Sequence, residues 1–331
     1  MISLRRVVVV TGGLLLLLLL VMLFALTRGT VEIGLGELIA VARGGGEGAA
    51  RSIVLDIRLP RIVLAGVVGG GLATAGVAFQ ALLKNPLAEP YILGVSSGSG
   101  VGVILAMMAG SISAWLLPLA SFAGALVTII LVYLLGRVGG RLHTTTMLLA
   151  GVMIAAFFGA VIMFLLSTAS LNEMGSALFW LMGDLSGADN RKALIAILYC
   201  GAGVILLYAN FRGLNLLTVG EETALHLGAG VEGLKVSIFI TASLMTGLSV
   251  AFSGLIGFVG LVVPHSARLL FGGDHRLLLP ASALLGGAFL VLSDTIARSL
   301  LAPAELPVGV ITASVGAPLF IYLLKRRRVQ G

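Results

Sequence analysis

The side chains that most often carry catalysis or metal binding are few in this chain, and they form no known pattern. The four histidines, His143, His226, His265 and His275, lie in no H-E-x-x-H sequence or other metal-ligand spacing. None of the four lysines belongs to a phosphate-binding G-x-x-x-x-G-K-[ST] loop, and no G-x-S-x-G sequence marks a nucleophilic serine. We therefore predict no catalytic, cofactor-binding or metal-binding residue.

Two other groups of charged residues have patterns that suit binding. Arg58 and Arg61 flank a proline at the start of a long apolar run, and Arg298 lies at the end of another. The segment 220–228, GEETALHLG, places two glutamates ahead of apolar residues and closes with a glycine. This order predicts a short amphipathic helix with acids in its first turn.

The composition indicates that the arginines and segment 220–228 are held in place by membrane-spanning helices. Hydrophobic residues make up 59% of the 331 positions and charged residues only 11%, whereas soluble domains have about 25% charged residues. Long apolar runs cross lipid only as helices, so the fold class is an all-α polytopic membrane protein. The net charge of +7 then belongs to the loops, and no nucleic-acid partner is expected. Cys200 is the single cysteine, which excludes an intrachain disulfide.

Hydropathy predicts about ten transmembrane helices in one domain that covers residues 1–331. The first follows two arginines and, at about 20 apolar residues, is longer than the core of a signal peptide. Gly66 and Gly70, and likewise Gly136 and Gly140, form small-xxx-small pairs that permit close helix crossings. A helix at 175–184 is too short to cross. The predicted spans are 7–27, 59–83, 93–110, 113–136, 145–167, 192–210, 234–254, 256–272, 277–298 and 307–325.

The distribution of basic residues orients this topology. An even number of spans places both termini on one side, which holds 13 of the 21 lysines and arginines. The positive-inside rule assigns that side, with segment 220–228, to the cytoplasm. Arg58, Arg61 and Arg298 then lie outside, where they fit two interpretations: anchors at the lipid head groups, or a basic rim for an acidic partner or anionic solute. Segment 220–228 fits either a docking helix for a soluble partner or an ordinary surface helix.

Acidic residues are nearly absent from the spans, and Asp294, near the end of one, is the plausible exception. Proton and sodium relays normally need such acids. If a solute is transported uphill, the energy must therefore come from elsewhere.

Several longer motifs extend over nearly the whole chain. They are RLPR at 58–61, GVAFQ at 76–80, NPLAEPYILGVSSG at 85–98, LLAGV at 148–152, GFVGLVVPH at 257–265, and ELPVGVIT at 305–312 followed by GAPLF at 316–320. In this order they resemble the permease subunits of ATP-binding-cassette (ABC) importers for ferric siderophores, haem and cobalamin. The resemblance implies a type II ABC importer permease fold in the inner or cytoplasmic membrane of a bacterium or archaeon.

The resemblance also implies partners. They are a second copy of the chain, with the path along the dimer axis, and a periplasmic or extracellular substrate-binding protein that docks outside. A separate cytoplasmic ATPase dimer would bind ATP and Mg, so this chain would be no enzyme and would hold no cofactor. Membrane lipid surrounds the whole.

Site residues carry over from the resemblance position by position. Arg58, Arg61 and Arg298 match a docking rim that forms ion pairs with glutamates of the binding protein. A loop at about 213–233 matches the coupling loop, which inserts into a cleft of the ATPase and in which we expect the two glutamates to pair with basic residues there. The coupling residues are Gly220, Glu221, Glu222, Ala224, Leu225, Leu227 and Gly228.

Cobalamin-type members of the family also suggest two layers of a cytoplasmic gate. Asn85 and Leu87, after the second span, match one layer, and Thr144 and Thr145, before the fifth span, match the other. Small polar or apolar groups separate there without stranding a charge. Helix termination ahead of Pro86 is a competing interpretation of Asn85.

The function implied is movement of a metal chelate into the cytoplasm by alternating access at a homodimer interface, without covalent chemistry in this chain. The alternative is a stand-alone secondary transporter or channel. The sequence does not identify the chelate; an iron chelate is favoured as the broader cargo group of the family.

Overall fold

The computed structural model describes residues 3–29, 31–45, 48–110 and 113–328, most of which are helical. Seven helices in this part of the chain are long and apolar enough to cross a membrane, and three shorter apolar helices accompany them. Each of the ten coincides with a predicted span to within about three residues. They are α1 (Leu4–Thr27), α4 (Leu59–Leu82), α5 (Val95–Met108), α6 (Leu116–Gly136), α7 (Thr144–Thr168), α9 (Asn190–Ala209), α12 (Val231–Ser253), α13 (Val259–Phe271), α14 (His275–Ser299) and α15 (Val308–Arg328).

Short elements connect these helices, and some were not predicted. The segment between the first two predicted spans contains α2 (Leu35–Ala42), α3 (Gly48–Ser52) and a π-helical turn, η1 (Ile53–Arg58). An antiparallel hairpin, β1 (Arg137–Val138) and β2 (Arg141–Leu142), precedes α7. The others are the 3₁₀ turn η2 (Pro90–Leu93), α8 (Leu171–Leu181), α10 (Phe211–Val219) and α11 (Glu221–His226).

The predicted short helix at 175–184 is α8, and it begins earlier than expected. Ser170 accepts a hydrogen bond from the Glu173 backbone N–H, and the Glu173 side chain accepts one from the Ser170 N–H. This capping box fixes the start of the helix at Leu171.

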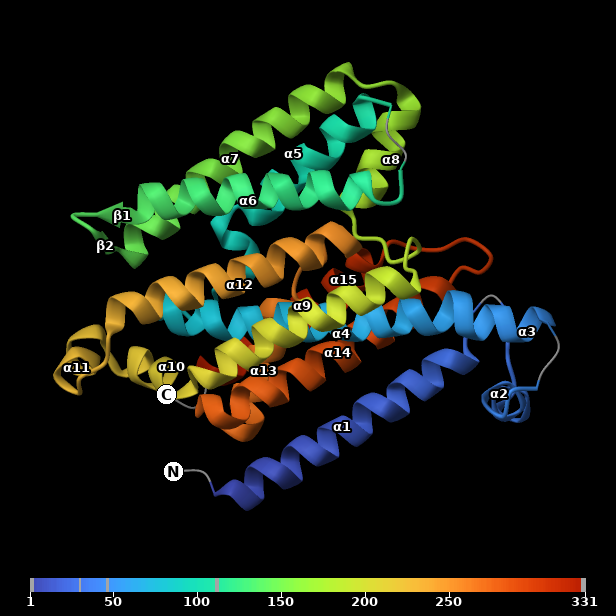
Figure 1. Cartoon of the computed structure of the whole chain (residues 1–331), viewed down its shortest axis with the longest axis horizontal. Helices are drawn as coiled ribbons and strands as arrows, with labels where there is room; N and C mark the ends of the chain where they lie inside the picture. The colour runs from blue at the N-terminus through green and yellow to red at the C-terminus, as the bar shows by residue number, and fades with distance from the viewer. Residues whose placement is uncertain (1–2, 30, 46–47, 111–112, 329–331) are drawn as a thin grey trace.

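Helix α4 is the centre of the molecule and is buried along nearly its whole length. Figure 1 shows α9, α12, α13 and α14 gathered around it, with α1 along the outer side of α14. Helices α5 to α8 pack together as a second group beside α12 (Figure 1). Many large apolar side chains of α1, α6 and α7 remain exposed, as expected of surfaces that face lipid or another subunit.

Close glycine contacts join α4 to its neighbours. A Cβ atom on Gly69 would lie 2.3 Å from the Gly286 carbonyl oxygen in α14, and one on Gly76 would lie 2.0 Å from the Gly260 oxygen in α13. The predicted pair Gly66 and Gly70 also faces α14. The predicted pair of Gly136 and Gly140 is wrong, because Gly140 lies in the hairpin turn at φ +81°.

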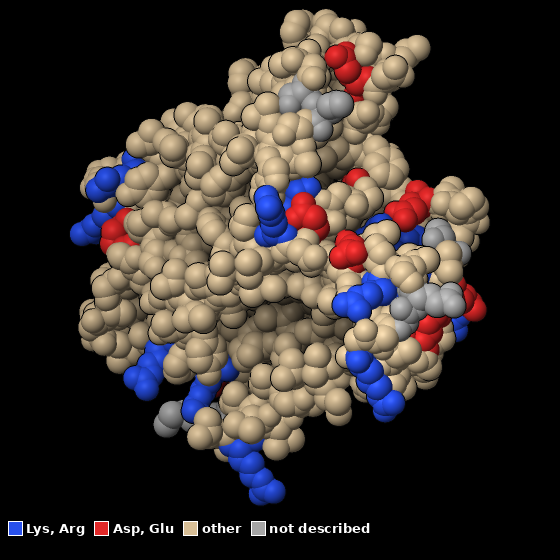
Figure 2. Space-filling model, turned by 45° about the vertical axis from the view of Figure 1, so that its right-hand side comes forward, with Lys and Arg blue, Asp and Glu red and all other residues tan. Residues whose placement is uncertain are grey.

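The molecule has two chemically distinct ends. Figure 1 shows α10, α11, the hairpin and both chain ends together at one end, here called the α11 end, and α2 and α3 at the opposite, α2 end. Charged side chains gather toward the ends, with a broad uncharged surface between them (Figure 2). This distribution suits a molecule that crosses the membrane from one end to the other.

Candidate functional site

Three arginines converge at the α2 end from separate elements. Arg58 ends η1, Arg61 lies in the first turn of α4, and Arg298 lies in the last turn of α14. Their exposed fractions are only 4%, 8% and 5%. All three side chains are therefore buried in this conformation, and their docking role stays a prediction.

Acidic partners within the chain account for part of this burial. The Arg61 guanidinium contacts Asp294 Oδ1 through Nη2 at 2.9 Å and Glu305 Oε2 through Nη1 at 2.9 Å. Arg298 Nε lies 3.5 Å from Asp294 Oδ2. Asp294, the acid singled out in the sequence, is thus the anion of an arginine cluster, paired on both sides.

The end of α1 and the segment after it supply further partners of these arginines. Arg58 Nη1 donates to the Leu26 carbonyl at 2.7 Å and Nη2 donates to the Val31 carbonyl. Arg298 Nη2 donates to the Ala25 carbonyl at 2.6 Å. The last carbonyls of a helix lack partners within the helix and carry a partial negative charge, so the two arginines cap α1.

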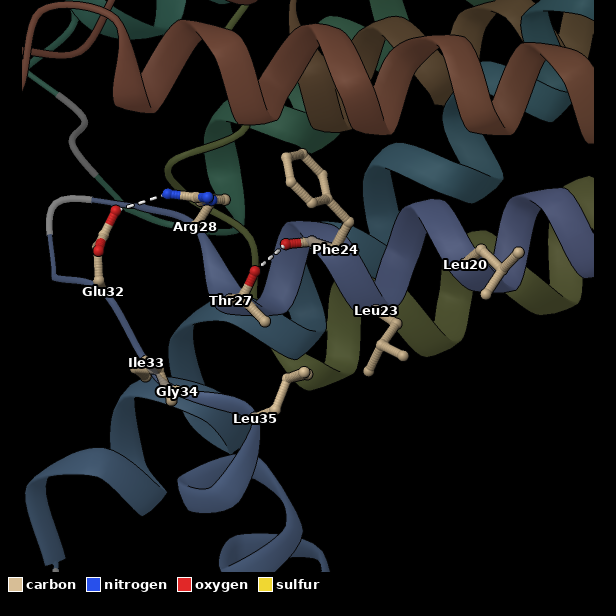
Figure 3. Close-up of a pocket in the computed structure, with 9 residues that line it drawn as sticks. All are labelled: Leu20, Leu23, Phe24, Thr27, Arg28, Glu32, Ile33, Gly34 and Leu35. Carbon is tan, nitrogen blue, oxygen red and sulfur yellow. Dashed lines mark hydrogen bonds and ion pairs between the residues drawn. The ribbon is translucent and has the colours of Figure 1, made fainter.

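A pocket of about 640 Å³ lies next to the arginine cluster, between the end of α1 and the start of α2. Figure 3 shows Leu20, Leu23 and Phe24 along its α1 wall and an ion pair between Arg28 and Glu32. The pair has an Nη1–Oε1 distance of 2.6 Å and is exposed. Because the two charges balance, this pocket does not extend the cationic cluster.

The segment predicted to couple to an ATPase forms the tip of the α11 end. Gly220 and Gly228 bound α11 with positive φ angles of 146° and 79°. Ala224 is fully buried on the inner face of the helix, whereas Leu225 and Leu227 are 57% and 66% exposed. The predicted short amphipathic helix is confirmed, and Leu225 and Leu227 present an apolar surface to solvent.

Helix α10, which leads into α11, is fixed to the start of α14. The Asn215 side chain accepts a hydrogen bond from the His275 backbone N–H at 2.9 Å and donates one to Asp274 Oδ1 at 3.0 Å. Since Asn215 bridges two elements distant in sequence, no local pattern could have identified it.

The two glutamates of α11 have different environments. Glu221 Oε2 lies 3.1 Å from Lys235 Nζ on α12, and Glu221 Oε1 lies 3.8 Å from Lys84 Nζ after α4. Glu222 is exposed. Glu221 thus has partners within the chain, which the sequence-based expectation of pairing with an ATPase did not foresee.

The predicted gate residues lie at the α11 end in two segments. Asn85 Oδ1 accepts a hydrogen bond from the Leu87 N–H at 2.9 Å, and Lys84 before it has a φ of +50°. Helix α4 ends at Leu82, and the Asn85 side chain closes the turn that follows it. Thr144 and Thr145 begin α7 directly after the hairpin. A gating role for these segments stays a prediction.

A buried contact that sequence reasoning missed holds the connection between α12 and α13. Glu89 Oε1 accepts from the Phe258 N–H at 2.7 Å, and the Tyr91 hydroxyl donates to the Ile256 carbonyl at 2.9 Å. Burial raises the pKa of the Glu89 carboxyl, and the Phe258 N–H opposes this shift. Both residues belong to the NPLAEPYILG motif, which was the available signal.

Within the described residues, no group of three or more His, Cys, Asp or Glu side chains is placed to hold a metal ion. The two ends carry different groups: a buried cluster of arginines and acids at one and an exposed apolar helix at the other.

Comparisons with known proteins agree with this arrangement. The profile of the FecCD transport family matches residues 16–326. The cobalamin import system permease protein BtuC of Halobacterium salinarum is 46% identical over 283 residues, covering 85% of this chain and 75% of that protein. The hemin transport system permease protein HmuU of Yersinia pestis is 40% identical over 283 residues, 84% of each chain.

A solved structure is similar over almost the full length. It is described as an inward-facing conformation of an ABC transporter of the metal-chelate type. The TM-score is 0.86 at 33% identity, and the match covers 96% of this chain and 98% of that chain.

Proposed function

Since this chain belongs to the FecCD transport family, whose profile matches residues 16–326, we propose that it is the membrane permease of an ATP-driven importer of metal chelates. The observation that carries the proposal is the exposed apolar helix α11, bounded by glycines, on a fold that matches a transporter of the metal-chelate type with a TM-score of 0.86. The chain itself performs no covalent chemistry, and ATP and Mg are bound by a partner.

The buried acid of the spans argues against the alternative, a secondary transporter or channel. Asp294 contacts Arg61 at 2.9 Å and lies 3.5 Å from Arg298. A carboxylate that couples transport to protons or sodium has to exchange its ion in each cycle. In this structure the Asp294 side chain is instead occupied by two neighbouring guanidinium groups.

The ATPase dimer binds at the α11 end in this proposal. Leu225 and Leu227 supply the apolar contact, and the exposed Glu222 supplies a charge for a basic residue of the ATPase. Both termini lie at this end (Figure 1), and the positive-inside rule assigns it to the cytoplasm.

The substrate-binding protein docks at the α2 end. Arg58, Arg61 and Arg298 together exceed their two acidic neighbours, Asp294 and Glu305, by one positive charge. A local excess of positive charge attracts an acidic partner and sets its register more than it adds affinity. Because the arginines are buried in this conformation, the contact requires them to turn outward.

The translocation path lies between two copies of the chain, which open alternately to the two sides as the ATPase binds and hydrolyses ATP. The exposed apolar faces of α6 and α7 offer surface for such a dimer. Asn85, Leu87, Thr144 and Thr145 form the cytoplasmic gate of this path.

The cargo is a metal chelate. The relatives whose cargo is named carry cobalamin and hemin, both metal complexes of large rings. They favour a macrocyclic complex over the siderophores that also fit the sequence resemblance.

Uptake into liposomes tests the function. The permease is reconstituted with its ATPase and binding protein, and cobalamin, haem and a ferric siderophore are offered in parallel. We expect ATP-dependent uptake of one chelate. ATP-independent uptake driven by an ion gradient would instead support the secondary transporter.

A further inference from the structure

Four charged side chains connect α11 to both predicted gate segments. Glu221, the first residue of α11, lies between Lys84 and Lys235. Lys235 also lies 4.0 Å from Glu232, one turn earlier on α12. The other carboxylate oxygen of Glu232 accepts a hydrogen bond from the Leu142 N–H at 2.5 Å.

This connection has two branches. Lys84 directly precedes Asn85, so one branch reaches the turn after α4 through a single ion pair. Leu142 belongs to the hairpin that immediately precedes α7, so the other branch reaches Thr144 through Lys235 and Glu232. The two branches thus reach the two predicted gate layers separately.

The branches differ in stiffness. Lys84 has a side chain that is 42% exposed and lies 3.8 Å from Glu221, so water replaces this contact at little cost. The Lys235 side chain is only 6% exposed and lies 3.1 Å from Glu221. Removing the carboxylate from a buried ammonium group leaves a poorly compensated charge, so Glu221 and Lys235 move together.

We propose that Lys235 is a positioning residue that transmits the displacement of α11 to the hairpin and the start of α7, while Lys84 transmits it to the turn after α4. The inference rests on the proposed function, because it assumes that an ATPase moves α11 and that the two segments form the gate. It adds to that function the residues that connect α11 to the gate, with a separate connection to each gate segment.

The experiment measures gate movement without any cargo. Spin labels are placed in separate samples at Leu87→Cys and Thr145→Cys, both at exposed positions, in the permease purified with its ATPase in nanodiscs. The distance between the labels of the two copies is recorded with and without ATP and Mg. The wild-type background should show a nucleotide-dependent shift at both positions.

Two lysine substitutions separate the branches. In Lys235→Met the shift at position 145 should fall by more than half, while the shift at 87 persists. In Lys84→Met the shift at position 145 should persist, and the shift at 87 should fall by a smaller fraction, because the Lys84 contact is the looser one. A role of Lys235 confined to stability would lower the melting temperature and leave both shifts intact, which would overturn the proposal.

A matched control and a second variant complete the design. Lys192→Met removes another buried lysine, 7% exposed, at the start of α9 at the α2 end, and should change neither shift. If Lys235→Met does not assemble, Glu221→Gln should weaken both shifts, and unchanged shifts there would contradict the inference. Absence of any shift in the wild-type background would refute the proposed function instead.

Discussion

The contribution of an arginine to stability depends on the burial of its acidic partner, because that partner keeps its charge when the arginine is removed. Arg61 holds Asp294, whose side chain is 1% exposed, whereas Arg28 pairs with Glu32, whose side chain is 77% exposed. Breaking a buried pair leaves an uncompensated charge, but breaking an exposed one is nearly neutral. The two pairs therefore form a natural comparison.

Replacement of Arg61 by methionine should destabilise the protein by roughly 3–5 kcal/mol, because Asp294 then keeps only the more distant Arg298. Thermal unfolding in detergent measures this loss. Adding Asp294→Asn should recover part of it, since the uncompensated charge is removed. Arg28→Met serves as the control, with a loss below about 1 kcal/mol; equal losses in the two single variants would contradict the argument.

Glu89 gives a pH dependence of stability. Its pKa is raised above the ordinary value of 4.5 by burial, so the folded protein binds the proton more tightly than the unfolded chain. The stabilisation is complete below pH 4.5 and is lost as the pH rises toward the raised pKa. Melting temperatures across this range should decline less in Glu89→Gln than in the wild type. Glu37→Gln, at an exposed position in α2, should follow the wild type.

At the scale of helices, packing around α4 depends on the absence of side chains. Gly69 and Gly286 bring the backbones of α4 and α14 into direct contact. Such contacts let helices approach closely in a membrane, where burial of apolar surface gives little driving force for association.

A methyl group in this contact should separate the two helices. Gly69→Ala places a Cβ atom 2.3 Å from the Gly286 oxygen, and we expect a loss of roughly 1–3 kcal/mol in thermal unfolding. Gly201→Ala in α9 is the matched control, because nothing lies within 4 Å of its added Cβ. The control should be neutral or gain up to about 1 kcal/mol from helix propensity. A loss of the same size in both variants would refute the packing argument.

The helices and strands also show which parts of the fold can be predicted from the sequence alone. Long apolar runs located ten helices of the described chain, seven of them long and apolar enough to cross a membrane, because lipid leaves the backbone no other option. Helices α2 and α3 and the hairpin are short and depend on contacts with the larger helices, so hydropathy did not reveal them. The burial of Arg61 could not be foreseen either, since its partners Asp294 and Glu305 are 233 and 244 residues away.

For the molecule as a whole, the proposed function assigns separate tasks to two ends that share the same helices. Helix α14 begins at His275, which Asn215 of α10 holds near α11, and its last turn carries Arg298 of the cationic cluster. One element therefore joins the proposed ATPase surface to the proposed docking surface. Partners at the two ends can therefore influence each other without a flexible domain between them.

Assembly with the ATPase should depend on the exposed leucines of α11. Substitution of Leu225 and Leu227 by serine should weaken binding by at least roughly tenfold, because each buried leucine contributes about 1.5–3 kcal/mol. Co-purification and binding titrations measure this loss, and the melting temperature of the permease alone should not change.

Leu301→Ser, at a leucine that is 57% exposed at the opposite end, is the control and should bind the ATPase normally. Full binding by the double variant would show that α11 is an ordinary surface helix.

The hydrogen bonds from Arg58 and Arg298 to the end of α1 have a consequence for how long a docked partner stays. A carboxylate of the binding protein gains these arginines only by displacing carbonyl groups that already satisfy them. Docking is then an exchange of bonds, and its net free energy is a small difference. Small differences give short residence times. In the proposed importer, carbonyl groups of the permease itself would thus compete with the substrate-binding protein for the arginines and favour its release after each turnover.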